Sequence, residues 1–177
     1  MKPQDIDVSK LKTGDVFLQR TGFIRYRPIT WFAWLIRVFT KSYYNHTSEC
    51  IMIDRKPYMV ESLWKWVTLR SWDMWLKVDM PRDMARLRMD WFELVTDSDE
   101  EYKYIDKALA EVTKGYDFKG IVKMFLYIIT GKRNQDWLTS ETEWWCSEFT
   151  AYMKDLDWRQ RYMPKDFLND RFTILAK

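Results

Sequence analysis

The residues best suited to chemistry are one histidine and two cysteines. His46 is the only histidine among the 177 residues, so any histidine-dependent catalysis must use it. Cys146 lies in a Trp-Trp-Cys-Ser-Glu sequence where we expect a helix to begin. The unpaired N–H groups and the dipole of a helix N-terminus favour a thiolate. Cys50 lies in an apolar segment and is expected to be a small buried residue. Cys146 is therefore the candidate nucleophile.

A nucleophilic cysteine also needs an imidazole as its base and a group that orients the imidazole. Glu61 closes the apolar segment 58–62 and is the leading candidate for that group. Two readings stay open for it, because an acid at the end of a strand either serves a partner or faces water at a sheet edge. A lone histidine is likewise often structural. Cys146, His46 and Glu61 form a candidate triad for attack on a carbonyl carbon.

Other chemistries have less support in the sequence. It contains no Gly-rich phosphate loop, no G-x-S-x-G motif and no C-x-x-C spacing. One histidine and two cysteines leave a tetrahedral zinc site one ligand short unless a carboxylate joins them. The 29 Lys and Arg are interleaved with 26 Asp and Glu, and a net charge of +3 is weak support for a nucleic-acid partner. We expect no metal, no other cofactor and no nucleic acid.

Composition indicates a single domain over residues 1–177. Hydrophobic residues make up 47% of the chain and aromatic residues 18%, enough to build a core without metals or disulfides. The first eight residues include two acids and no apolar run, unlike a secretory signal, so we expect a cytoplasmic protein. The most apolar segment, 28–40, is too short to span a membrane. It is either a core helix or a membrane-facing one. The oligomeric state is not predicted.

The hydrophobic pattern predicts strands first and helices later, which favours an α+β fold. We expect strands over 14–19, 47–53, 57–63 and 84–89, and helices over 28–40, 98–115, 119–130 and 146–153. The third of these helices, 119–130, should be buried, and residues 139–143 should cap the last one.

Three details of this prediction bear on the site. In helix 28–40, Trp31, Leu35 and Val38 or Phe39 are at the spacing of one apolar face. In helix 98–115, a capping box at Ser98 and Glu101 should precede an apolar stripe, and Gly115 should end the helix; the stripe consists of Tyr102, Ile105, Leu109 and Val112.

The third detail is the register of the predicted hairpin. With the turn centred between residues 53 and 54, His46 and Glu61 lie opposite one another. A slip of one residue would place them on opposite faces of the sheet.

Six short segments, in order along the chain, match the motifs of a known family. They are Gly14-Asp-Val-Phe-Leu-Gln19, Thr40-Lys-Ser-Tyr-Tyr-Asn-His-Thr47, Lys56-Pro-Tyr-Met-Val-Glu-Ser62, Gly115-Tyr-Asp-Phe118, Trp145-Cys-Ser-Glu-Phe149 and Met163-Pro-Lys-Asp-Phe167. On these segments the chain resembles the circularly permuted branch of the NlpC-like papain-fold cysteine hydrolases, the bacterial YiiX-like family. It is more distantly similar to lecithin:retinol acyltransferases.

The resemblance implies a permuted papain-like fold, with an antiparallel sheet packed against helices. It also implies a thiol hydrolase, a cysteine peptidase or amidase, or an acyltransferase, that cleaves an amide, ester or thioester bond through an acyl-enzyme. The substrate would be a cell-wall peptide or a lipid-like molecule. In this scheme Cys146 is the nucleophile, His46 the general base and then acid, and Glu61 the residue that orients the imidazole.

The same resemblance suggests residues around the reacting carbonyl. Gln19 and the backbone N–H of Cys146 would stabilise the oxyanion, and Tyr44 and Tyr116 would line the cleft. The chain departs from the family pattern at Trp145, where a Tyr is usual. The alternative function is a catalytically silent protein that binds a lipid or peptide on the same fold, with peripheral membrane contact through residues 31–39.

Overall fold

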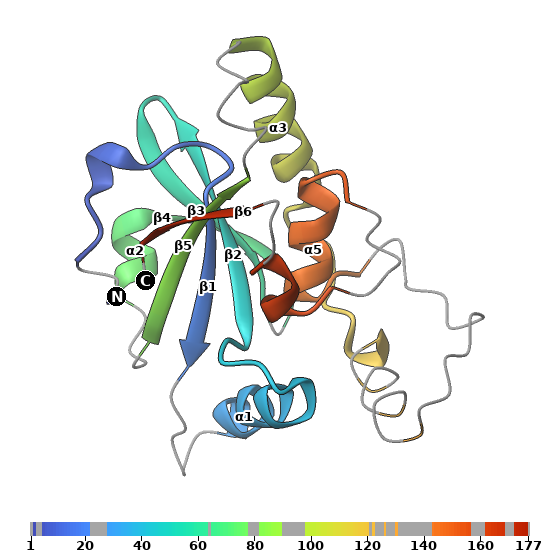
Figure 1. The fold of residues 1–177 in the computed structure, drawn as a ribbon. Helices are drawn as coiled ribbons and strands as arrows, with labels where there is room; N and C mark the ends of the chain where they lie inside the picture. Colours follow the sequence, from blue (N-terminus) through green and yellow to red (C-terminus); the bar gives the residue numbers. More distant parts are fainter. Residues whose placement is uncertain are drawn as a thin grey trace.

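The centre of the protein is a six-stranded antiparallel sheet (Figure 1). The computed structural model describes residues 2, 5–21, 28–63, 65–77, 82–89, 98–120, 122, 126, 130, 143–156, 162–168 and 172–176. The strands are β1 (Val16–Thr21), β2 (His46–Ile53), β3 (Lys56–Ser62), β4 (Val67–Ser71), β5 (Arg82–Met89) and β6 (Phe172–Ala176), in the spatial order β4-β3-β2-β1-β5-β6. β4 and β6 were not predicted from the sequence.

Helices pack on both faces of this sheet and at one end, so the α+β class is confirmed. They are α1 (Pro28–Thr40), α2 (Trp72–Leu76), α3 (Ser98–Glu111) and α5 (Cys146–Met153), with short 3₁₀ segments at Val8–Lys10 and Pro164–Phe167. Helix α1 lies at the end of the sheet where β1 ends and β2 begins (Figure 1). The predicted helices 28–40 and 146–153 are confirmed with the same bounds.

Successive side chains along each strand point to opposite faces of the sheet, so the core has a layer on each face. Toward α3 and α5, the sheet contributes aliphatic side chains that pack against the buried faces of these helices; this layer includes Ile51, Val60, Val67, Ile105, Ala108, Phe149 and Met153. The opposite layer is aromatic. Phe17 lies 5.9 Å from the ring of Trp72 and 5.7 Å from that of Trp75, both from α2. Part of the unusual tryptophan content therefore fills the core.

A tight turn between β2 and β3 sets the hairpin register. Asp54 and Arg55 both have positive φ, 50° and 61°, as a two-residue hairpin turn with the right twist requires. Ile53 pairs with Lys56, and continuing the ladder sets Glu61 opposite residue 48. The predicted pairing of Glu61 with residue 46 is therefore wrong by two residues. Since the side-chain period of a strand is two, both residues still share one face.

Helix α3 buries a different face from the predicted stripe. Ile105 is buried, as expected, but Tyr102 is 65% exposed and Leu109 is 40% exposed. Tyr104 and Ala108 take their places against the sheet. The prediction failed because apolar residues lie on two faces of this helix. The spacing alone did not distinguish the face with Tyr102 and Leu109 from the face that meets the sheet and α5.

Three further expectations about the helices need correction, and a fourth point concerns the orientation of α1. Helix α1 exposes Trp31 and Val38 and buries Ile36. Helix α3 ends at Glu111, and Thr113 adopts the left-handed conformation with φ 82°, before the predicted stop at Gly115.

The segment predicted as a buried helix over 119–130 is helical at 118–120, 122, 126 and 130. Val122 and Leu126 are exposed there, and its other positions lie outside the described residues. Residues 139–142 of the predicted cap also lie outside them. The observed N-cap of α5 is Trp145, which makes no side-chain capping bond.

A buried polar cluster joins α3, α5 and the sheet. Lys154 directly follows α5 and is fully buried, and its Nζ lies 3.4 Å from Glu49 Oε2 on β2. The same ammonium donates to the backbone oxygen of Gly14 at 2.6 Å and to the Tyr104 hydroxyl of α3 at 2.9 Å. Tyr104 in turn donates to Glu49. Burial raises the pKa of Glu49 to about 7, against the opposing charge of Lys154.

Candidate active site

Cys146 is the first residue of α5 and is buried. Its backbone N–H belongs to the first turn, where amide groups have no partner within the helix. Two contacts fix this helix on the sheet. Thr150 Oγ1 donates to Thr47 Oγ1 at 2.9 Å, and the Phe149 ring is fully buried in the core. The start of α5 therefore lies beside the start of β2, where His46 is the first residue.

The environment of Cys146 favours the thiolate. Burial, the largest single influence, raises the pKa of the thiol. The charge of His46, a hydrogen bond with its ring, and hydrogen bonds with the Thr47 backbone and the Ser147 hydroxyl together outweigh burial and lower that pKa below its ordinary value. Cys50 shows the opposite case. Burial among apolar side chains, with Asp15 nearby, raises the pKa of Cys50 far above its ordinary value.

The imidazole of His46 is held from its other side. His46 Nε2 lies 2.8 Å from Glu61 Oε2, which leaves Nδ1 as the ring nitrogen available to the thiol. Glu61 is almost completely buried, and its second oxygen accepts a hydrogen bond from Arg70 Nη2 on β4. Arg70 compensates the buried carboxylate, which keeps Glu61 an acceptor for the His46 N–H. The structure thus brings together all three residues of the candidate triad.

Two of the other predicted site residues are not among those that line the thiol pocket. Gln19 pairs with His46 across the β1–β2 ladder, and its Nε2 donates to Ser48 Oγ at 2.9 Å within the sheet. Tyr44 is buried in the core with Leu87 and neighbouring residues. Tyr44 therefore lies in the core and does not line this pocket, whereas the role of Gln19 as an oxyanion donor stays a prediction.

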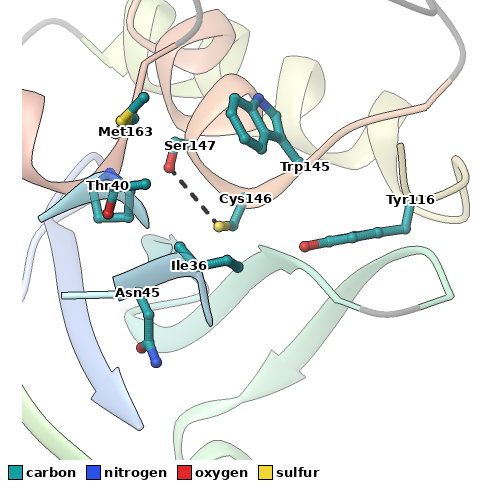
Figure 2. A pocket seen from close by; sticks show the side chains of 9 residues that line it. Ile36, Thr40, Asn45, Tyr116, Trp145, Cys146, Ser147 and Met163 are labelled. Atoms are coloured by element: carbon teal, nitrogen blue, oxygen red, sulfur yellow. Dashed lines mark hydrogen bonds between the residues drawn. The ribbon is translucent and has the colours of Figure 1, made fainter. Parts of the chain in front are cut away.

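A small pocket opens beside the thiol (Figure 2). It encloses about 250 Å³ including its opening to solvent. Its walls come from α1, the start of β2, α5 and the 3₁₀ segment near the C-terminus; the lining residues are Ile36, Thr40, Asn45, Tyr116, Trp145, Cys146, Ser147, Met163 and Pro164. Most of this lining is apolar, so the pocket suits an apolar group attached to the reacting carbonyl.

Tyr116 is the predicted cleft residue that does line this pocket. Its hydroxyl points toward the Cys146 thiol (Figure 2). Burial, together with the charges of Cys146 and Glu148, raises the pKa of Tyr116 well above its ordinary value. The phenol therefore keeps its proton and can donate a hydrogen bond into the pocket.

Backbone contacts hold the segment that presents Tyr116 and Cys146. Trp144 N donates to Gly115 O at 2.9 Å, and the Trp144 indole donates to Glu111 Oε2 at 2.5 Å. A Cβ on Gly115 would lie 3.2 Å from Glu143 Cγ, so the close approach of the two segments favours glycine. These contacts hold the segment before Tyr116 against the segment before Cys146.

Sequence reasoning missed Arg70, Ser147 and Asn45. Arg70 reaches Glu61 only through the pairing of β3 with β4, which no motif indicates. Ser147 Oγ lies 3.9 Å from Cys146 Sγ. Because Ser147 directly follows Cys146 in the Cys-Ser-Glu motif, the sequence could have indicated this contact. Asn45 joins α1 to β1, because it donates to Ala33 O at 3.2 Å and accepts from Thr21 N at 3.0 Å.

Within the described residues, no helix is both long enough and apolar enough to cross a bilayer. Nor does the described part of the chain group three His, Cys, Asp or Glu side chains as a metal site.

Comparison with known proteins supplies a structural relative. No protein-family model matches the chain, and no curated protein matches its sequence. Among solved structures, the metalloprotein YiiX from Escherichia coli O157:H7 is similar, with a TM-score of 0.58 and 19% sequence identity. The match covers 94% of this chain and 97% of the YiiX chain. The chain therefore has a YiiX-like fold, consistent with the papain-like architecture expected from its motifs.

Proposed function

We propose that this protein is a cysteine hydrolase or acyltransferase of the permuted NlpC-like branch, acting on an amide, ester or thioester. The observation that carries the proposal is the position of Cys146 at the start of α5, close enough to His46 for the imidazole to lower the thiol pKa, together with the 2.8 Å contact of His46 Nε2 with Glu61 Oε2. A nucleophile, a base beside it and an acid that orients the base are the arrangement that covalent acyl transfer requires. The YiiX-like fold supports it through similarity of architecture.

The reaction begins with proton transfer from the Cys146 thiol to His46. The thiolate attacks the carbonyl carbon, and the electron pair of the C=O bond moves onto oxygen. We assign stabilisation of that oxyanion to the backbone N–H of Cys146 and to the hydroxyl of Tyr116, which points toward the thiol (Figure 2). His46 then protonates the leaving amine, alcohol or thiol, and the acyl-enzyme forms. Water or another acceptor gives a proton to His46 as it attacks and releases the acyl group.

The first test is the pH dependence of iodoacetamide alkylation, followed for both cysteines by peptide mass spectrometry. We expect Cys146 to react with an apparent pKa below the free-thiol value of about 8.5. The His46→Ala variant should shift this value upward. Cys50 serves as the internal control, because burial keeps it protonated and unreactive. Equal labelling of both cysteines, or a Cys146 pKa that ignores His46, would contradict the proposal.

The second test addresses turnover. p-Nitrophenyl butyrate should acylate Cys146, detected as a mass shift of its peptide and a burst of p-nitrophenol. Tyr116→Phe should slow acylation by about 100-fold, the loss typical for one oxyanion donor, while leaving the alkylation pKa close to that of the parent. If Cys146 alkylates as expected but no acyl-enzyme forms with esters, thioesters or peptides, the silent binding protein becomes the better assignment.

A further inference from the structure

Helix α1 presents an apolar stripe to solvent. Trp31 is 50% exposed, Trp34 45% and Val38 50%. Their spacing of three and four residues puts them on one side of the helix. Large apolar side chains gathered in this way differ from scattered exposed hydrophobic residues, which need no explanation. We refer to these three residues and the cations beside them as the α1 surface.

Positive charges border this stripe on one side. Arg37 follows Trp34 by three residues, which places it along the flank of the stripe. Lys41 directly follows the helix, with a left-handed backbone conformation (φ 51°). Arg20 at the end of β1 lies close enough to Arg37 to lower the pKa of its guanidinium, after burial, the main cause. The Arg20 guanidinium also stacks 4.4 Å from the ring centre of Tyr43, which is exposed.

Among the described residues, these cations have no acidic partner in an ion pair. Residues 28–40 contain no Asp or Glu. In the part of the chain that the structure describes, no carboxylate forms an ion pair with Arg20, Arg37 or Lys41. The α1 surface therefore combines exposed tryptophan with uncompensated positive charge.

The opposite side of the same helix forms a wall of the thiol pocket. Ile36 and Thr40 line that pocket with Cys146. Lys165 Nζ donates to Thr40 O at 2.8 Å, which fixes the end of α1 to the 3₁₀ segment on the other wall. Only the thickness of one helix separates the α1 surface from the reacting sulfur.

We propose that the α1 surface docks on the face of an anionic lipid bilayer. Tryptophan rings settle at the boundary of headgroups and acyl chains, and neighbouring Arg and Lys bind anionic headgroups. This docking does not depend on the proposed catalytic function. A second copy of the chain fits this surface poorly, because symmetrical contact would bring like charges together.

The experiment is vesicle flotation of the full chain, with phosphatidylcholine alone and with about 30 mol% phosphatidylglycerol. The protein should float only with the anionic vesicles, and binding should fall as salt rises. The W31S/W34S variant should weaken binding at least about tenfold through loss of apolar insertion. The R37Q/K41Q variant should weaken it by about fivefold for each charge removed, while R37K/K41R should bind as the parent does.

Matched changes elsewhere control for a general loss of hydrophobicity or charge. Trp66 is 49% exposed, with Lys65 over its ring, on the connection before β4. K65Q/W66S should bind vesicles as the parent does. Circular dichroism and thermal unfolding check that each variant is folded. Equal losses for the Trp66 and Trp31 variants would overturn the docking proposal, as would the absence of any flotation.

The remaining outcomes separate docking from catalysis. Cys146→Ser should float like the parent, because the thiol lies off the membrane-facing side. Flotation together with failed Cys146 alkylation would overturn the catalytic proposal and leave docking intact. Self-association on size-exclusion chromatography that W31S/W34S abolishes, without flotation, would assign the α1 surface to a second copy and overturn the membrane proposal.

Discussion

At the scale of single residues, the thiol of Cys146 depends on a chain of three partners. His46 stabilises the thiolate, Glu61 stabilises the imidazolium, and Arg70 compensates the charge of Glu61. Each partner lies on a different strand or helix, so the charge state of the sulfur reports on the packing of the whole end of the sheet. The two acceptor oxygens of Glu61 have separate roles, one toward His46 and one toward Arg70.

Changing Glu61 and Arg70 separates these roles. Glu61→Gln removes the charge that favours imidazolium, so the pKa of Cys146 should rise and alkylation at pH 7 should slow by about tenfold for each unit of rise. Arg70→Gln should instead lower the free energy of unfolding by about 1.5–3 kcal/mol, since it leaves a buried carboxylate short of one charged donor. Alkylation kinetics and urea unfolding measure the two effects. Arg55→Gln, at an exposed position, is the control for the loss of one positive charge. These roles would be contradicted if Arg70→Gln mainly slowed alkylation and Glu61→Gln mainly lowered the free energy of unfolding.

The triad residues could be named from the sequence, but the reasons differ among them. His46 stood out because it is the only histidine, and Cys146 because a helix was expected to begin there. Glu61 stood out as an acid closing the apolar segment 58–62, and the ordered motifs also matched it. Arg70 could not be found, because its contact needs β4, a five-residue strand with no clear hydrophobic pattern. Tyr44 was placed in the cleft by resemblance alone, and its side chain lies in the core. Gln19 was suggested on the same ground, and its role stays a prediction.

At the scale of elements, the α3 helix shows why periodicity located helices better than their buried faces. An apolar stripe establishes that a helix is present, but which residues meet the sheet depends on its rotation against α5. Tyr104 was overlooked as a core residue because the predicted stripe was built on Tyr102, which lies on another face of the helix. In the structure the Tyr104 hydroxyl binds Glu49 and Lys154, which makes its burial favourable.

Two substitutions on α3 test the observed face. Ile105→Ala should lower the free energy of unfolding by about 2–4 kcal/mol, because it leaves a cavity in the core beside Phe149. Tyr102→Ala, one turn away and largely exposed, should change stability by less than about 0.5 kcal/mol. Chemical denaturation with matched m-values measures both. Similar losses at the two positions would show that the predicted stripe is the buried one after all.

At the scale of the whole molecule, long-range pairing was the part least accessible from sequence. β6, the last element, lies beside β5 at an edge of the sheet. No local pattern specifies such a partner across about half of the chain. The buried cluster of Glu49, Lys154 and Tyr104 is similarly distributed, since it draws on β2, the end of α5 and α3. It links the two helices of one layer to the central strands.

This cluster predicts a pH dependence of stability. Burial raises the pKa of Glu49 from about 4.5 in an unfolded chain to about 7 in the folded protein. Between these values the folded state binds more protons than the unfolded state, so stability falls as pH rises from 4.5 to 7. The total contribution is at most about 3 kcal/mol.

The isosteric Glu49→Gln variant removes this titration, so its stability should fall less over the same pH range than that of the parent. Thermal or urea unfolding at several pH values measures the two slopes. Glu100→Gln, at an exposed position of α3, controls for the general loss of one acid. Parallel slopes for the parent and Glu49→Gln would contradict the assignment of this pH dependence to Glu49.

The two-residue turn at Asp54 and Arg55 has a consequence for how the gene can change. The turn lies at the far end of the hairpin from His46. The number of residues in it nevertheless decides whether Glu61 lies on the same face of the sheet as His46. Gain or loss of a single codon there would move Glu61 away from the imidazole without touching either residue. Codons added in pairs would keep the parity. Descendants of this chain that retain the chemistry should therefore vary in length at this hairpin by even numbers.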